Sequence, residues 1–319
     1  MKWRRKTPPP PTMVLDPCLG DPTARRLYDA LENREWPAAR AVLAATEHPD
    51  DRAFYLDVCG AVPGVQGWIG FHTSDDNLAQ LVRGAHAVHW AWDARGGYRA
   101  QYTSRDRFEL FFERLRLAES YLYDVISRDP DEVSAWAFLI RTARGLQLPL
   151  DDGEFRYREA TKRHPSHWKA NHEWMQTLCK KWFGSDEWMH QFARDTATRS
   201  PDGSMVHALV ALAHLESTPE LDANQTTGYM TQPNVRADLR TAAEHSIWHP
   251  AADLRPGSAA ALNIFALAFS LSEDPSAAGA VFRQLGERPT EQPWGYLGGD
   301  PAQRFLEARS RAAAAVRPE

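Results

Sequence analysis

The chain has 319 residues, of which 43% are hydrophobic and 25% charged, so it is long enough to bury a full globular core without disulfides or a structural metal. Its net charge of -5 at pH 7 and the lack of a basic face argue against a phosphate-neutralising surface, and we expect no binding to nucleic acid. No apolar run is long enough to predict a membrane span, and three scattered cysteines without a C-x-x-C pair predict reduced thiols in a cytoplasmic protein.

The first residues combine a basic run with a run of prolines. KWRRK at residues 2–6 is followed by PPPP at residues 8–11, and no apolar stretch follows the charges as a secretory signal requires. Polyproline favours extended backbone without internal hydrogen bonds. We therefore expect residues 1–20 to form a disordered, proline-rich tail.

Two strongly patterned segments predict long helices in the first half of the chain. TSDDNLAQLVRGAHAVHWAWDARGG, residues 73–97, opens on Ser74 with acidic residues that complement the helix dipole, and it closes on Arg95 and Gly96. The apolar positions of this segment lie three or four residues apart and place His89 on the buried face. RDRFELFFERLRLAESYLYDVISRDP, residues 105–130, has the same apolar spacing over its whole length.

Prolines recur at a nearly constant spacing before helical patterns. HPDD, DPDE, HPSH and SPDG begin at residues 48, 129, 164 and 200, and Pro130, Pro165 and Pro201 lie 35 and 36 residues apart. This period is close to the roughly 34 residues of tetratricopeptide repeats, and no segment alternates apolar and polar residues long enough to predict a strand. We predict an all-α fold, a tetratricopeptide-like α-solenoid of antiparallel helix pairs. Further helices are expected near residues 131–144, 154–163, 166–182, 186–199, 203–217, 235–247, 257–271, 275–286 and 301–314.

The domain organisation follows from one polar, turn-rich stretch. STPELDANQTTGYMTQPN separates the repeat pattern from a strongly apolar C-terminal part that contains AALNIFALAFSL. We expect an N-terminal helical-repeat region over residues 21–217, a linker over 218–234 and a C-terminal helical region over 235–319 that packs on the array.

Several segments together resemble an actinobacterial family of tetratricopeptide-like proteins that carry a domain of unknown function. The resemblance covers about residues 20–310, and its most specific part is the K-W-x-G-S-x-x-x-M-x-x-F-A-R pattern, which departs from the usual Gly-Gly-Ser of the family at Phe183. It implies an α-helical repeat fold and carries no assigned activity or catalytic residues. The matching segments are HWAWDARGG (89–97), KKWFGSDEWMHQFARDTATRSPDGS (180–204), ALAHLE (211–216) and NIFALAFSLSEDPSAAGAVFRQLGERPTEQPWGYLGGDP (263–301).

The common catalytic motifs are absent from the sequence. HEWMQ at residues 172–176 has Gln176 where the second histidine of a zinc-protease motif would stand, and no P-loop, dinucleotide fingerprint or nucleophile elbow occurs. The sequence therefore identifies neither a catalytic residue nor a cofactor.

His86 and His89 form the first candidate site. Three residues apart on one helix, they lie on neighbouring parts of its surface and could share a ligand, although a metal would need a third ligand from another helix. They are the only metal-ligand candidates that we name. The favoured interpretation is structural, with His89 bonded in the core and His86 nearer solvent.

The second candidate is HPSHWKANHEW, residues 164–174. His164 precedes the expected helix, and His167 and His172 are five residues apart, which separates them by roughly 140° around the axis. One metal ion cannot easily use both. We interpret the stretch mainly as a repeat start and retain His172 as an interior histidine that needs partners from other helices.

The third and fourth candidates lie on apolar or aromatic helices. His207 and His214 are two turns apart, too far to share one metal, and His214 with Glu216 predicts a buried polar network or, second, a ligand groove. Trp92 and Arg95 with Trp182 could form a cation–π pocket, although helix–helix packing is the commoner use of such residues.

Two functions remain open from the sequence. The first is an interaction or adaptor protein that binds a peptide or partner protein in the concave groove of the array. The alternative is a ligand-binding protein or small-molecule enzyme, metal-dependent or not, with histidines and tryptophans around an enclosed cavity.

Overall fold

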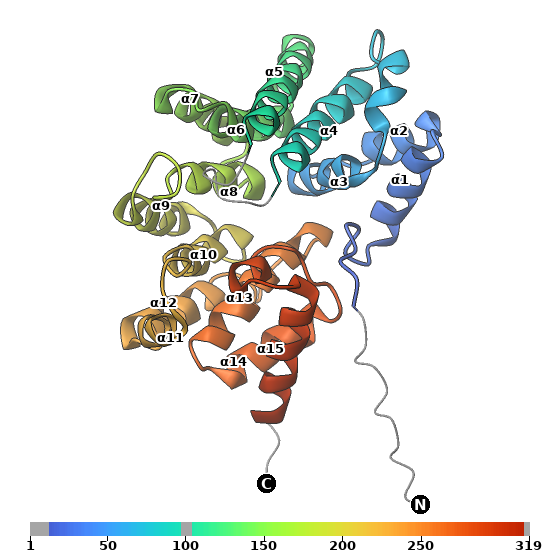
Figure 1. Ribbon diagram of the computed structural model, residues 1–319. Coiled ribbons are helices and arrows are strands. Elements are labelled where there is room, and N and C mark those ends of the chain that lie inside the picture. The colour runs from blue at the N-terminus through green and yellow to red at the C-terminus, as the bar shows by residue number, and fades with distance from the viewer. Residues whose placement is uncertain (1–12, 97–103, 316–319) are drawn as a thin grey trace, which may run out of the picture.

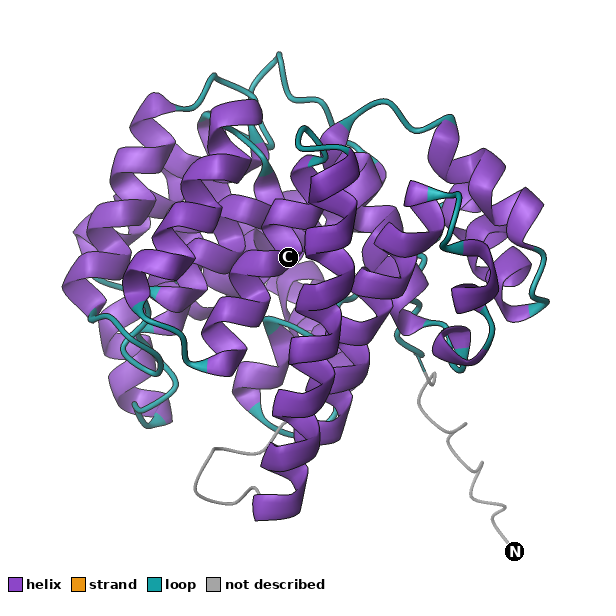
Figure 2. Ribbon diagram, turned by 90° about the horizontal axis from the view of Figure 1, so that it is seen from above, coloured by secondary structure: helices purple, strands orange, loops and turns teal. Residues whose placement is uncertain are grey.

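The structure is a computed structural model that describes residues 13–96 and 104–315. Within these ranges every regular element is a helix and none is a strand, in agreement with the predicted all-α class (Figure 2). None of the helices in the described ranges combines the length and hydropathy needed to cross a membrane.

The first half of the described chain runs through eight α-helices and two short 3-10 turns. Each helix packs on the next one along the chain or on the one after it, so the helices form a continuous curved layer (Figure 1). The elements are α1 (Pro22–Glu32), α2 (Trp36–Ala44), α3 (Pro49–Ala61), η1 (Val65–Gly67), η2 (Ile69–His72), α4 (Asn77–Arg95), α5 (Arg105–Arg128), α6 (Val133–Leu146), α7 (Leu150–Arg163) and α8 (Trp168–Thr177).

The second half continues the layer and turns it back toward its beginning. The apolar helix α13, whose phenylalanines are buried, lies at the centre of this half and packs against α10, α14 and α15. The elements are α9 (Asp186–Arg199), η4 (Met205–His207), α10 (Ala208–Glu216), α11 (Ala223–Met230), α12 (Pro233–Glu244), η5 (Pro256–Ser258), α13 (Ala259–Leu271), α14 (Pro275–Leu285), η6 (Trp294–Leu297) and α15 (Pro301–Ala315).

The proline steps of the sequence lie at helix starts. Pro49 is the first residue of α3, and the steps at Pro130, Pro165 and Pro201 directly precede α6, α8 and the η4–α10 segment. A proline in the first turn costs the helix nothing, because the N–H that it lacks would have no hydrogen-bond acceptor within the helix at that position. At α4 the cap is Asp76, whose carboxylate accepts from the Leu78 N–H, and not the predicted Ser74.

The C-terminal half returns to contact α3. Arg255, just before η5, pairs with Asp51 of α3 at 2.9 Å, although 204 positions separate them in the sequence. A Cβ added at Gly257 would lie 3.2 Å from Phe54 Cβ, so the backbone of η5 packs directly on α3. Leu19 belongs to the C-terminal hydrophobic core. The curved layer therefore closes on itself through these contacts.

The hydrophobic core divides near the end of α8. One cluster runs from Cys18 to Leu178, and the other joins Leu19 to residues between Met175 and Ala312. The segment expected to be a linker, 218–234, contains α11 and the start of α12, and Met230 is fully buried. Its polar composition reflects a helix start, because the Asp222 side chain and Gln225 form a capping box.

The predicted tail is shorter than expected. Residues 1–12 lie outside the described residues, but Cys18 is fully buried, which contradicts a disordered tail over all of 1–20. The carboxylate of Asp16 organises this segment, since it accepts from the N–H groups of Cys18 and Gly20 and pairs with Arg25.

Candidate functional site

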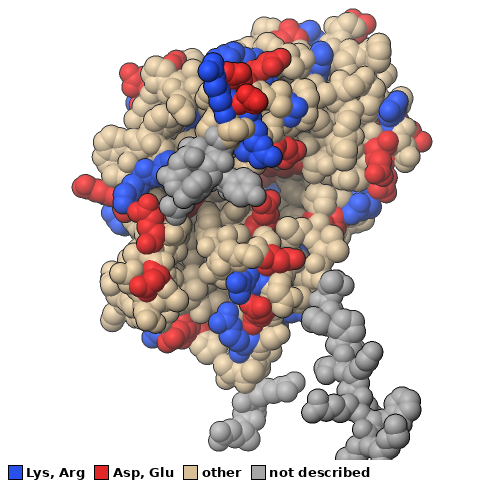
Figure 3. All heavy atoms as spheres, in the orientation of Figure 1, with Lys and Arg blue, Asp and Glu red and all other residues tan. Residues whose placement is uncertain are grey.

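A cavity of about 680 Å³, open to solvent on one side, lies between the two ends of the closed layer. Its walls come from α3, the start of α8, the turn before η4 and the start of α13, together with residues 15–19 and 289–291. The face of the molecule seen in Figure 1 is hollowed near its middle, with acidic side chains beside the hollow (Figure 3). This volume lies within the range of about 300–1,000 Å³ that is typical of small-molecule sites.

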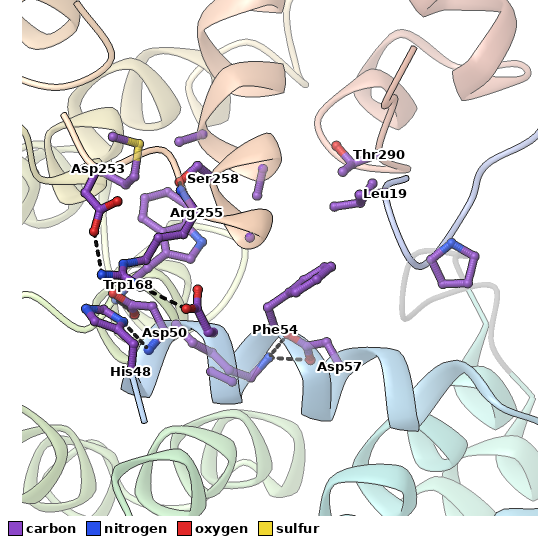
Figure 4. Close-up of a pocket in the computed structure, with 18 of the residues that line it drawn as sticks. Leu19, His48, Asp50, Phe54, Asp57, Trp168, Asp253, Arg255, Ser258 and Thr290 are labelled. Atoms are coloured by element: carbon purple, nitrogen blue, oxygen red, sulfur yellow. Dashed lines mark hydrogen bonds and ion pairs between the residues drawn. The ribbon is translucent and has the colours of Figure 1, made fainter. Parts of the chain in front are cut away.

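The cavity combines apolar walls with an excess of carboxylates. Phe54 points from α3 into the cavity, and His48 and Asp50 lie toward one end of that helix with Asp57 further along it (Figure 4). Leu19, Trp168 and Met205 supply further apolar surface. Among the described residues, six carboxylates line the cavity against two Lys or Arg side chains, Lys169 and Arg255; the acids are Asp16, Asp50, Asp51, Asp57, Asp253 and Glu291.

Asp57 is the centre of a charged group on the cavity wall. It accepts from Lys169 Nζ at 2.7 and 2.9 Å and from His89 Nε2 at 2.9 Å. Burial raises the pKa of this carboxyl, but the charge of Lys169 and the His89 bond outweigh it and hold the pKa well below its usual range. The Asp57 side chain nevertheless keeps 37% of its surface accessible, because it faces the hollow.

The close approach of α3 and α4 fixes His89 in this position. A Cβ at Gly60 would lie 2.1 Å from His89 Cδ2, so only glycine leaves room for the ring. Desolvation lowers the pKa of His89, although the Asp57 bond opposes the shift. The imidazole is therefore held beside the carboxylate at the cavity wall.

The structure separates His86 from His89 and reverses their expected exposure. His86, predicted to lie nearer solvent, is 5% exposed and bonds the Val62 carbonyl through Nε2 at 2.9 Å, whereas the side chain of His89 is 23% exposed. Burial lowers the pKa of His86 to about 4. The exposure of His86 was predicted wrongly because the buried face of α4 is wider than the row of apolar residues that the sequence suggested. His86 belongs to this wider face and points toward the end of α3. The two rings do not share a ligand.

Trp92, Arg95 and Trp182 do come together. The tryptophan rings meet edge to face with centroids 5.8 Å apart, and the Arg95 guanidinium lies 5.6 and 5.7 Å from them. Arg144 lies 5.5 Å from the Trp182 ring and pairs with Glu173 at 2.6 Å. Burial raises the pKa of Glu173, but the charges of Arg144 and other cations outweigh it and lower the pKa to about 2. This cluster lies outside the cavity lining and is joined to it through Lys169, 3.8 Å from Glu173.

Glu216 and His172 lie beyond the same cluster. Glu216 accepts from Gln176 Nε2 and Tyr296 Oη, both at 2.5 Å, and pairs with Lys181 at 2.7 Å. His172 packs against the cavity-lining Trp168 with ring centroids 5.7 Å apart, and desolvation lowers its pKa to about 4. Neither residue lines the cavity itself.

The other two predicted histidines belong to separate networks. His207 bonds the Pro201 carbonyl at 3.1 Å. His214 bonds Tyr229 Oη at 2.7 Å and Asp238 at 3.2 Å, and its ring lies 4.9 Å from that of His190. His214 and Glu216 were expected in one network, but they point to different neighbours because they lie two residues apart on α10.

Among the described residues, one group has the geometry of a metal site, and the sequence did not predict it. His48, Asp50 and His164 each offer a ligand atom, and the three atoms lie within 4.8 Å of one another. Ligand atoms around a tetrahedral ion lie about 3.3 Å apart, so a small inward movement would complete the set. Both histidines stand one position before the proline of a helix-start step, in HPDD and HPSH. That shared register was the signal available in the sequence.

Comparison with known proteins identifies no relative. No protein-family model, no curated sequence and no solved structure matches this chain. The function must therefore be argued from the site.

Proposed function

We propose that this protein binds a small organic cation, an amine with an apolar body, in the cavity on the inner side of a tetratricopeptide-like array. The observation that carries the proposal is the excess of carboxylates in the described lining, six against two Lys or Arg side chains, around a cavity of small-molecule size. An excess of negative charge around a cavity is stabilised by a cationic partner.

The details of the lining favour an amine over a simple inorganic cation. Phe54 and Trp168 offer aromatic surface close to Asp50 and Asp57, which suits a ligand with a charged end and an apolar body. Asp51 pairs with Arg255 through Oδ2, while its buried Oδ1 has no hydrogen-bond partner in the described part of the chain. An ammonium group would supply the donor that a buried carboxylate oxygen requires.

Closure of the layer favours a small ligand over the peptide or protein partner of the adaptor hypothesis. The Arg255–Asp51 pair and the packing of Gly257 on Phe54 cross the inner side of the array. A peptide in a concave groove needs a continuous open surface. We therefore place the small-molecule proposal before the adaptor proposal.

Matched pairs of amines and carboxylates test the proposal. Phenethylamine and 3-phenylpropionate, with further pairs of the same kind, would be titrated into chelator-treated full-length protein and the shift in Tm measured. We expect at least one amine to raise the Tm and its carboxylate partner to have no effect. Stabilisation by the carboxylates alone, or by no member of the panel, would contradict the proposal.

A matched pair of variants locates the bound cation. Asp57→Asn removes one charge from the cavity wall and keeps the shape of the side chain, so amine affinity should fall at least tenfold. Asp238→Asn removes a charge outside the cavity, beside His214, and should leave amine affinity unchanged. Equal loss in both variants would indicate a nonspecific effect of net charge.

A further inference from the structure

Two His-Pro steps that are 116 positions apart in the sequence meet at the cavity wall. His48 precedes α3, His164 follows α7, and their rings meet edge to face with centroids 5.7 Å apart. Asp50, in the first turn of α3, lies beside both, and all three side chains line the cavity. We propose that His48, Asp50 and His164 bind one divalent transition-metal ion.

The carboxylate is already oriented for this role. Asp50 Oδ1 accepts from the Trp168 N–H at 2.7 Å and lies 3.6 Å from Nε2 of the fully buried His167. Its Oδ2 lies 3.8 Å from His164 Nε2 and makes no hydrogen bond within the described residues. The backbone of α8 therefore holds one oxygen and leaves the other for a metal, as outer-shell partners do in known metal sites.

The histidines differ in how they are used without a metal. His164 makes no ring hydrogen bond within 3.5 Å to a described residue. His48 Nδ1 accepts from the Asp50 N–H at 3.2 Å and so caps α3. A metal at His48 either replaces this long bond at Nδ1, or binds Nε2 after the ring proton moves to Nδ1. In both cases one long hydrogen bond is exchanged for a metal–nitrogen bond.

The donor set selects the class of ion. Two imidazoles with one carboxylate suit zinc, cobalt or iron, whereas Mg²⁺ and Ca²⁺ prefer oxygen ligands alone. Three protein ligands leave at least one coordination position of a tetrahedral ion, and it would face the cavity because its ligands line the wall. The site lies two helical turns from Asp57, roughly 10 Å along α3, so an ammonium group bound at Asp57 would lie well away from the metal.

Metal titration of the full-length protein tests the site. After removal of metals with a chelator, Zn²⁺ would be titrated by calorimetry and Co²⁺ by its visible absorption, with Mg²⁺ as a control. We expect one Zn²⁺ per chain and no Mg²⁺ binding. Absence of Zn²⁺ binding at micromolar concentrations would overturn the proposal.

Three variants assign the ligands while preserving the local structure. His48→Asn keeps a good helix cap, and Asp50→Asn keeps the acceptor for the Trp168 N–H. His164→Ala removes a ring that makes no hydrogen bond to a described residue. Each should weaken Zn²⁺ binding at least about tenfold, with circular dichroism confirming the fold. His72→Ala, at an exposed histidine of η2 outside the cavity, should bind like the unaltered protein.

The metal experiment can fail without affecting the amine proposal. Zn²⁺ affinity that is unchanged in all three variants would show that other histidines bind the ion and would overturn this site. Amine binding is measured on metal-free protein, so either proposal can fail while the other stands.

Discussion

The histidines at the cavity and those between α9 and α12 differ in how fully their rings are bonded. His214 uses both ring nitrogens, bonding Tyr229 and Asp238, and its neighbour His190 bonds Ser217 at 3.0 Å. His164 at the cavity wall is 29% exposed and makes no ring hydrogen bond to a described residue. A histidine with two partners stabilises helix contacts, whereas one with free nitrogens beside a carboxylate is available to a ligand.

The largest expected effect comes from the buried ion pair behind the cavity. Removal of one partner leaves an uncompensated charge, so Glu173→Ala should lower the free energy of unfolding by about 3–5 kcal/mol because Arg144 remains buried. Urea denaturation measures the change. Glu154→Ala, which breaks an exposed pair with Arg158, is the control and should cost less than about 1 kcal/mol. Equal effects would show that the Arg144–Glu173 pair is not buried as described.

Acid should destabilise the fold well before the carboxylates titrate. Burial lowers the pKa of His86 and of His167 to about 4, so each stays neutral in the folded chain while its unfolded form binds a proton below about pH 6.5. This stability is complete above pH 6.5 and is lost as the pH falls toward 4. The two histidines together should cost about 4 kcal/mol at pH 5.

Urea denaturation at pH 7 and pH 5 checks this dependence, and His86→Gln should remove about 2 kcal/mol of it. An unfolding free energy that is the same at both pH values would contradict the burial of these rings.

Packing of α3 on α4 should tolerate no added methyl group. Gly60→Ala forces the His89 ring away from Asp57 and should cost about 1–3 kcal/mol. Gly228→Ala on α11 meets open space and should be neutral or stabilising by up to about 1 kcal/mol. The denaturation midpoint should therefore fall in Gly60→Ala and stay the same or rise in Gly228→Ala.

The smallest effect is expected in the bonded network. Tyr229→Phe removes the hydrogen bond to His214 Nδ1 and should cost about 1 kcal/mol. It should leave both amine and zinc affinity unchanged, because neither residue lines the cavity. A loss of ligand affinity in this variant would show that the network contributes to the site.

The all-α class and most helix starts were predictable because they depend on local signals. Apolar spacing, first-turn prolines and the final Gly96 marked α4 and its neighbours, and Gly96 does take a positive φ of 74°. The helix within 218–234 was not predicted, because the polar residues that form its capping box are of the same types that are typical of a linker.

The cavity could be predicted only in part. Of the predicted site residues, only His89 lines the cavity; Trp92, Arg95 and Trp182 meet as the sequence suggested, but outside it. The carboxylates of α3 face a cavity only because Arg255 returns to Asp51, 204 positions away in the sequence. No local sequence pattern encodes a contact over that separation. His48 and His164 were visible as a repeated His-Pro step, but their meeting also depends on the packing of α3 against α8.

A crystal structure of the protein with the most stabilising amine of the panel tests the central claim most directly. We expect the ammonium nitrogen within about 3 Å of a carboxylate on α3, Asp57 or Asp51, and the apolar body of the ligand against Phe54 and Trp168. Amine density on the outer surface, or between α9 and α12 beside His214, would contradict it.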